Sequence, residues 1–325
     1  MIAENGSGVD FYMHTSTAAR QSARKHLIHR IKRYKLLYIM LIPIIAYFFV
    51  FSYWPYWGLQ IAFRDYKIYS GMAASPWSKP LFKNFINFFD SPDFMRLIIN
   101  TLYISFQRIL WGFPVPILFA LVLNEVRAKK FKRLVQTITY FPNFLSWAVY
   151  AGIIMVFIQP TGIINKLFVS AGWEAPNILV NRQLFVPMLI VTAIMKSFGF
   201  SAIIYLSALS GIDEQLYEAA IVDGAKRLRQ IWHVTLPGIR STICVMLIFA
   251  VSGVLNAGFD QIFNFYNASV KEVADIIDTY VYRMGLENGR YSLATVVGLF
   301  KGVIGFILLI SANAITRRLG EAGIW

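Results

Sequence analysis

Residues 218–237 read EAAIVDGAKRLRQIWHVTLP, a polar stretch between two strongly hydrophobic segments. Glu218-Ala219-Ala220 is predicted to open a short helix, because alanine has the highest helix propensity and an early acidic residue complements the helix dipole. Gly224 is expected to interrupt that helix, and the Leu236-Pro237 pair to close the stretch before the next apolar run. A polar helix held between two membrane spans usually contacts a partner outside the membrane, so this stretch predicts a membrane protein with an exposed docking segment.

The rest of the chain is too hydrophobic for a soluble domain. Hydrophobic residues make up 57% of the 325 residues, and the mean hydropathy is +0.54. Its apolar runs are long enough to cross about 30 Å of hydrocarbon, which takes roughly 20 helical residues. We therefore predict an all-α polytopic membrane protein, in which residues 1–35 form a basic tail and residues 36–320 form a domain of six transmembrane helices at 36–58, 97–125, 134–158, 184–211, 241–263 and 292–315.

The net charge of +14 is placed as expected for a membrane protein. Lys and Arg concentrate in the tail 1–35, in the loop after the second span and in the segment 212–240. Because cationic loops stay on the cytoplasmic side of a membrane, we expect both termini and the 212–240 segment in the cytoplasm, and no nucleic-acid partner. On the opposite side, apolar residues at helical spacing predict a helix across the outer mouth over 273–281.

Motifs for catalysis and metal binding are missing from the sequence. No G-x-x-x-x-G-K-[ST] phosphate loop is present, so we expect this chain to bind no ATP itself. No Cys/His spacing typical of a metal site occurs, and the single cysteine, Cys244, lies in an apolar run. We therefore expect no catalytic residue, no metal and no cofactor. A membrane enzyme would need clustered acidic or His residues, and a stand-alone secondary transporter would need inverted repeats; neither pattern is visible.

The spacing of Glu-Ala-Ala, Gly and Leu-Pro closely resembles the coupling loop of ABC-importer permeases, the membrane subunits of importers fed by a solute-binding protein. Asp223 fits the family pattern, and Val234 replaces the isoleucine that is usual two residues before Leu-Pro. The resemblance implies a type I ABC-importer-like fold in the bacterial cytoplasmic (inner) membrane. It also implies a second permease subunit, most often a different chain, and two ATPase subunits that dock on Glu218, Ala219, Ala220, Asp223, Gly224, Leu236 and Pro237.

Ionisable residues within the spans point to a solute pathway, because a charge in hydrocarbon faces a cavity or a partner. Arg108, Lys196 and Lys301 are cationic and suit an anionic solute, whereas pairing of Asp260 with either lysine is an equal alternative. Aromatic rings near these charges suit stacking on sugar rings, and Asn and Asp suit bonding to hydroxyls. The expected solute pathway therefore comprises Lys196, Phe200, Asn256, Phe259, Asp260 and Lys301.

Three further stretches resemble the carbohydrate permeases of this family, in particular the branch for oligo- and polysaccharides. They are the basic lead into YIMLIPIIAYFFVFSYWPYWGLQIAF, the RDYK that follows, and TYFPNFLSWAV at 139–149. This similarity implies a permease that passes a saccharide from a solute-binding protein into the cytoplasm. An acidic polymer such as alginate is the expected solute, and a neutral oligosaccharide is the alternative.

Overall fold

The computed structural model describes residues 33–318, so most of the predicted basic tail lies outside the described residues. The chain divides into two compact units, one up to Gln60 and one from Ile61 onward. Within residues 33–318 every regular element is a helix, and the β-type pairing is limited to one bridge between Arg64 and Trp77. The predicted all-α class is therefore confirmed.

The first predicted span corresponds to one long helical segment. Helix α2 (Lys35–Phe48) continues as the π-helical turn η1 (Phe49–Tyr53) and then as the 3-10 stretch η2 (Trp54–Phe63). Pro43 lies inside α2, which runs on past it, as membrane helices tolerate. Residues Lys35–Phe63 are long and apolar enough to cross a membrane.

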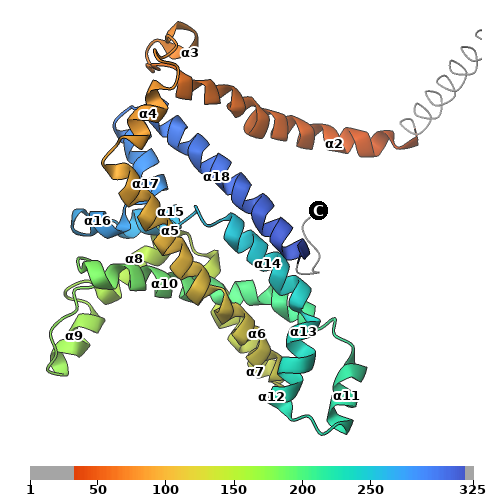
Figure 1. Cartoon of the computed structure of the whole chain (residues 1–325). Coiled ribbons are helices and arrows are strands. Elements are labelled where there is room, and N and C mark those ends of the chain that lie inside the picture. The colour runs from red at the N-terminus through yellow and green to blue at the C-terminus, as the bar shows by residue number, and fades with distance from the viewer. Residues whose placement is uncertain (1–32, 319–325) are drawn as a thin grey trace, which may run out of the picture. The chain divides into compact units, whose positions relative to one another are not determined.

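The second unit supplies the remaining spans (Figure 1). Within the described residues, five helical segments of the chain can cross a membrane by length and composition, or six if one strongly bent pair counts as a single span. The segments of the second unit are α5 (Asp93–Gly112) with α6 (Pro114–Glu125), α8 (Trp147–Ile158) with α9 (Ile163–Ser170), α10 (Arg182–Leu209), α18 (Tyr291–Arg318), and the bent pair Arg227–Gly238 with α14 (Arg240–Ser252).

Shorter helices connect these spans. On the segment between the first and second spans lie α3 (Gly71–Ala74) and α4 (Lys83–Phe89). Between the second and third lie α7 (Lys129–Tyr140) and η3 (Phe141–Phe144). The stretch before α18 contains α15 (Phe259–Phe265), η5 (Ala268–Val270), α16 (Lys271–Ala274), α17 (Ile277–Tyr282) and η6 (Arg283–Glu287).

The third span differs from the prediction of one helix over 134–158. The chain turns after α7 at Phe141–Phe144, where Pro142 interrupts the helical hydrogen bonding. Ser146 then caps a new helix by accepting a hydrogen bond from the Val149 amide, and α8 begins at Trp147. Helix α7 packs against α10 at Gly199, where an added Cβ would lie 2.5 Å from the Thr139 carbonyl oxygen. A span therefore starts at residue 147, and α7 is a separate helix.

The fifth span is also broken, so the predicted continuous helix over 241–263 is wrong. Helix α14 ends at Ser252, and α15 starts only at Phe259. The intervening residues turn, with the Asn256 amide donating to the Gly253 carbonyl, and Gly258 adopts a left-handed φ of +89°. Glycine is the residue that takes this conformation at least cost, and it separates the two helices.

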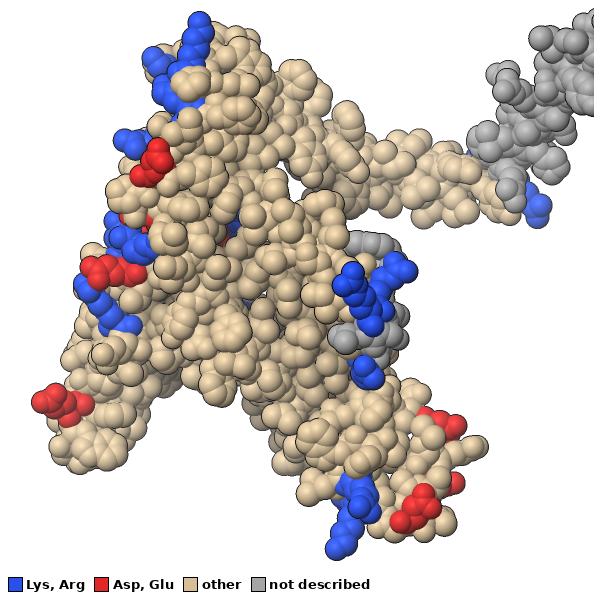
Figure 2. Space-filling model, in the orientation of Figure 1, with Lys and Arg blue, Asp and Glu red and all other residues tan. Residues whose placement is uncertain are grey.

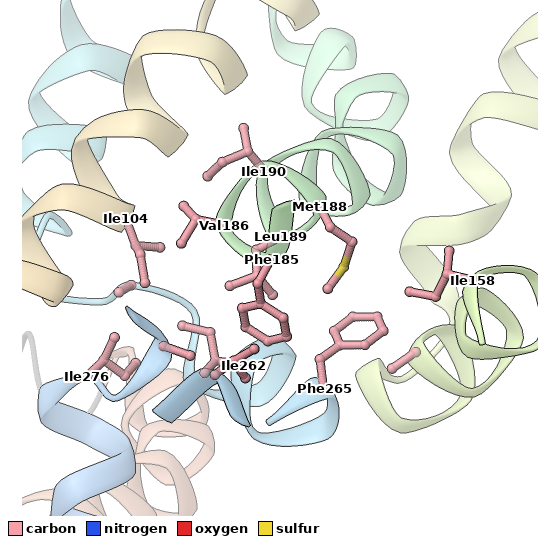
Figure 3. Packing of buried hydrophobic residues seen from close by; sticks show 14 residues of the cluster. Ile104, Ile158, Phe185, Val186, Met188, Leu189, Ile190, Ile262, Phe265 and Ile276 are labelled. Carbon is pink, nitrogen blue, oxygen red and sulfur yellow. The ribbon is translucent and has the colours of Figure 1, made fainter. Parts of the chain in front are cut away.

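The core of the second unit is built around α10, which packs against α5, α6 and α7. Figure 3 shows Phe185, Val186 and Leu189 of α10 meeting Ile262 of α15 and Ile104 of α5. All five side chains are buried. Because these elements are far apart in the sequence, this cluster fixes α15 against α10 although the fifth span is interrupted.

The segment before α18 carries a buried ionic cluster. The carboxylate of Asp275 is fully buried, accepts two hydrogen bonds from the Arg283 guanidinium at 3.0 and 2.7 Å, and lies 3.7 Å from Arg96. The hydrogen bond to Asp275 raises the pKa of Arg283 above its ordinary value. Asp275 separates α16 from α17, so the single helix predicted over 273–281 is divided there.

Candidate functional site

The first part of the predicted docking segment is helix α11, Glu214–Val222. Its N-cap is Asp213, whose carboxylate accepts a hydrogen bond from the Gln215 amide. The prediction that Glu218 stands near the helix start is therefore wrong, because the cap and first turn lie upstream. Glu218 and Ala219 are instead exposed in the middle of the helix.

Gly224 ends α11, as predicted, through a defined C-cap. Its φ is +74°, its amide donates to the Ile221 carbonyl at 2.9 Å, and the Ala225 amide donates to the Ala220 carbonyl at 2.8 Å. These two bonds form a Schellman motif, in which a left-handed residue satisfies the last helical carbonyls. An added Cβ at Gly224 would meet no atom of the second unit within 4 Å, so the space beside it is open.

The second part of the segment folds back beside α11. It comprises α12 (Arg227–Gln230), the π-helical turn η4 (Ile231–Thr235) and α13 (Leu236–Gly238). The hydroxyl groups of Tyr217 and Thr235 lie 3.0 Å apart and join the two parts, and Arg227 forms a 3.1 Å ion pair with Glu125 at the end of the second span. The chain then bends by 64° into α14. Leu236 and Pro237 thus precede the bend, as expected.

The docking segment is amphipathic on its exposed surface. Figure 2 shows acidic side chains over α11 and basic side chains over α12 at the same end of the second unit. Large apolar side chains are exposed among them, namely Leu216, Ile221, Val222, Leu228 and Trp232. Ala219 and Asp223 are exposed as well, and Ala220 is half-buried. The sequence pattern did not indicate the exposure of Val222, Leu228 and Trp232, because their helical phase depends on where α11 ends.

Lys196 occupies the middle of α10 and is buried, with 6% of its surface exposed. Its ammonium group donates to three carbonyl oxygens of the turn after α7, at 3.0 Å to Pro142, 3.2 Å to Asn143 and 2.7 Å to Leu145. It also lies over the Trp147 ring, 5.3 Å from the ring centre. Lys196 therefore supplies a donor to the turn that breaks the third span, where the Pro142 carbonyl also accepts from the Leu145 amide at 3.2 Å.

A cavity of about 620 Å³ opens beside Lys196. Its wall includes Asn143, Trp147, Asp260 and Asn264. Within the described residues, no carboxylate lies within ion-pair distance of Lys196, and the Asp260 side chain has no hydrogen-bond or ion-pair partner. Lys196 and Asp260 therefore face one polar cavity without forming the salt bridge weighed from the sequence.

The other predicted pathway residues are dispersed. Phe200 stacks edge-to-face on Phe144 with ring centres 5.8 Å apart and is partly exposed. Asn256 lies in the break of the fifth span and lines a separate cavity of about 230 Å³ with Arg108. Phe259 lines a third cavity, of about 580 Å³. Asn256 was expected on one continuous span with Asp260, but the left-handed Gly258 separates the two, whereas Phe259 and Asp260 begin α15 together.

Lys301, on α18, is paired internally, but with a different carboxylate from the one considered. Its ammonium group lies 2.6 and 2.8 Å from the two carboxylate oxygens of Asp278, in the first turn of α17. Both side chains are about one-fifth exposed, at 22% each. Pairing of Lys301 with Asp260 is therefore excluded, and the charge of Lys301 is balanced by Asp278.

Arg108 forms the remaining polar contact between spans. Its guanidinium donates to the Gln261 side chain, whose amide in turn donates to the Leu189 carbonyl and the Thr192 hydroxyl, both at 2.7 Å. The same guanidinium occupies the space that a Cβ at Gly258 would need. This chain of contacts joins α5, α10 and α15 through neutral acceptors. The sequence signalled the buried arginine but not its partner, because Gln261 carries no charge to mark it.

Comparison with known proteins defines the class. Residues 112–321 match the family of binding-protein-dependent transport system inner membrane components, and this chain belongs to that family. It is therefore the membrane component of a transport system. The matches confirm the predicted family and fold class.

Individual relatives are similar over most of their length. The chain is 46% identical over 270 residues to Protein LplB of Bacillus subtilis (strain 168), covering 83% of this chain and 84% of that protein. It is 44% identical over 307 residues to the polygalacturonan/rhamnogalacturonan transport system permease protein YteP of the same organism, covering 94% of this chain and 95% of that protein.

Solved structures agree with these relatives. A chain of a bacterial ABC transporter involved in the import of the acidic polysaccharide alginate matches with a TM-score of 0.83 and 40% identity, covering 90% of this chain and 99% of that chain. A second structure, of a bacterial alginate transporter in complex with an alginate pentasaccharide-bound periplasmic protein, also gives a TM-score of 0.83.

Proposed function

We propose that this chain is the permease subunit of an ATP-driven importer that passes an acidic oligo- or polysaccharide from a solute-binding protein into the cytoplasm. The observation that carries the acidic class is the similarity to an alginate importer chain over 90% of the sequence. The relative named for polygalacturonan and rhamnogalacturonan transport supports the same class.

The proposed partners follow from the docking segment and from the similar transporters. The exposed apolar side chains of the docking segment, surrounded by charges of both signs, suit an interface with ATPase subunits. The family depends on a solute-binding protein, and one similar transporter has been seen with its periplasmic protein. A second permease subunit, of a different chain, completes the proposed assembly of one heterodimer of permeases and two ATPases.

Uptake by the reconstituted importer tests the solute class. Proteoliposomes that contain the permeases, the ATPases and the binding protein should take up an alginate pentasaccharide in an ATP-dependent manner. They should not accumulate maltopentaose, a neutral saccharide with the same number of sugar units. Uptake of maltopentaose but not of the uronate would replace the acidic assignment with a neutral one. Failure of ATPase subunits to co-purify with the chain would contradict the importer assignment itself.

We propose that the docking segment and both termini face the cytoplasm, since cationic loops gather on that side. The test places single cysteines in a Cys244→Ser background at four exposed positions. An impermeant maleimide should label Tyr69→Cys and Glu272→Cys in intact spheroplasts. Labelling of Ala128→Cys and Lys226→Cys should require that the inner face be opened. Reaction of Lys226→Cys in intact spheroplasts would reverse the orientation.

A further inference from the structure

A polar cavity of about 880 Å³ lies outside the spans, between the segment that follows the first span and the start of α18. Its volume falls within the range of small-ligand sites. In the proposed orientation, it opens on the outer face. The side chains that matter for its chemistry are Tyr66, Lys67, Lys83, Asn87, Arg290 and Tyr291.

The charges of this outer cavity are incompletely balanced. Three cationic and two acidic side chains line it. Lys83 is paired with Asp65 at 3.2 Å, whereas Lys67 and Arg290 have no carboxylate partner among residues 33–318. Asp90 is exposed and unpaired within the same residues. Two free cations and one free carboxylate therefore face the cavity, which favours an anionic ligand that also carries hydrogen-bonding groups.

The walls of the outer cavity also suit sugar rings. Tyr66 and Tyr291 meet edge-to-face, with ring centres 5.8 Å apart and planes at 88°. Aromatic faces of this kind cover the C–H surface of a sugar, while the exposed Asn87 amide can bond a hydroxyl group.

The backbone around the cavity is held in place before any ligand arrives. The Tyr66 amide donates to the Ser292 hydroxyl at 3.1 Å, and that hydroxyl donates to the Arg64 carbonyl at 2.7 Å. The buried Asn84 amide donates to the Ala62 and Arg64 carbonyls at 3.0 and 3.1 Å. Because these bonds join segments that are distant in sequence, the two sides of the cavity form one preorganised site.

Tyr291 also lines the 580 Å³ cavity that contains Phe259 and Asp278. The outer cavity therefore shares a wall with a cavity bordered by α15 and α17. Tyr291 thus lies between the outer cavity and the cavity that Phe259 of α15 lines.

We propose that the outer cavity is a saccharide subsite that holds a stretch of the acidic chain on the permease itself. Its carboxylates would bind Arg290 and Lys67, and its rings would rest on Tyr66 and Tyr291. This proposal rests on the proposed function and deepens it, because it assigns recognition of the uronate to the permease as well as to the binding protein.

Direct binding tests the subsite. The purified importer, with its partner subunits but without the solute-binding protein, is titrated with an alginate pentasaccharide and with maltopentaose. Arg290→Gln and Lys67→Gln should each weaken pentasaccharide binding by about tenfold, the effect expected for one charge-assisted hydrogen bond. Arg290→Lys keeps the positive charge and should lose less affinity for the pentasaccharide than Arg290→Gln. The control Lys271→Gln removes an exposed cation from α16, outside the cavity, and should bind as the wild type does.

Several outcomes would overturn the subsite. Absence of pentasaccharide binding to the wild-type importer, when the solute-binding protein is left out, contradicts it. Wild-type affinity for the pentasaccharide in both Arg290→Gln and Lys67→Gln also contradicts the subsite. So does a result in which these two variants bind the pentasaccharide normally and lose affinity only for the solute-binding protein. These results leave the proposed function intact if ATP-dependent uptake of the uronate persists. Uptake of the neutral saccharide alone would instead refute the acidic assignment.

Discussion

Replacing Gly224 with aspartate is expected to abolish ATP-driven uptake while the protein remains inserted and folded. The left-handed φ of +74° makes any side chain cost about 1–2 kcal/mol there, which the fold can absorb. A Cβ at this position would meet no atom of the second unit within 4 Å. It would instead enter the proposed ATPase interface, where a buried unpaired carboxylate costs about 2–5 kcal/mol. ATPase activity and uptake in proteoliposomes should both fall, with thermal stability in detergent nearly unchanged.

Gly172 provides a matched control for this substitution. It has a similar φ, +80°, and equally open space beside it, but it lies beyond α9 rather than in the docking segment. Gly172→Asp should therefore carry the same backbone strain and retain uptake. Normal uptake by Gly224→Asp would remove the coupling role from this segment, and equal loss in both variants would reduce the effect to strain.

Replacing Lys196 with methionine should strongly destabilise the protein. The change keeps an unbranched side chain but removes the donor for three carbonyl oxygens in the turn after α7. The Pro142 carbonyl keeps the Leu145 amide, but the Asn143 and Leu145 carbonyls lose the lysine at about 1–3 kcal/mol each, so the loss should reach several kcal/mol and shift thermal unfolding markedly. The unfolding temperature is measured without saccharide, because the Lys196 ammonium binds carbonyl groups of its own chain.

Two companion variants separate this role from pairing and from solute contact. Ser197→Ala alters a neighbour that lines the same cavity but bonds only within its own helix, to Ala193, and should leave stability nearly unchanged. Lys196→Met combined with Asp260→Asn should stay as unstable as the single variant. Recovery of stability in the combination would reveal an ion pair after all, and normal stability with impaired uptake in Lys196→Met would favour direct solute contact.

Hydropathy predicted the class and the number of spans because a run of apolar residues reports length in hydrocarbon directly. It failed at residues 141–146 and 253–258, where the runs stay apolar although the backbone turns. Membrane proteins tolerate such turns only where protein groups satisfy the backbone. At the first break that group is Lys196, a residue more than fifty positions away, which no local pattern can reveal.

The docking segment was more predictable than the solute pathway. Gly224 and Pro237 act through local backbone geometry. As the spacing predicted, Gly224 lies at the end of a helix and Pro237 lies just before a bend. Pathway residues depend on tertiary neighbours. The partner of Lys301 proved to be Asp278 on α17, and the left-handed Gly258 separated Asn256 from Asp260.

The close approach of Arg108 to Gly258 couples two distant positions in evolution. A side chain at 258 would displace the guanidinium from its contact with Gln261 and also strain the backbone, so it should be tolerated better once a smaller residue has replaced Arg108. Replacing Arg108 first meets no such obstacle, because Gly258 can remain glycine after the arginine is lost. Descendants of this sequence should therefore change position 108 before position 258, and a designer who wishes to straighten the fifth span must begin on the second.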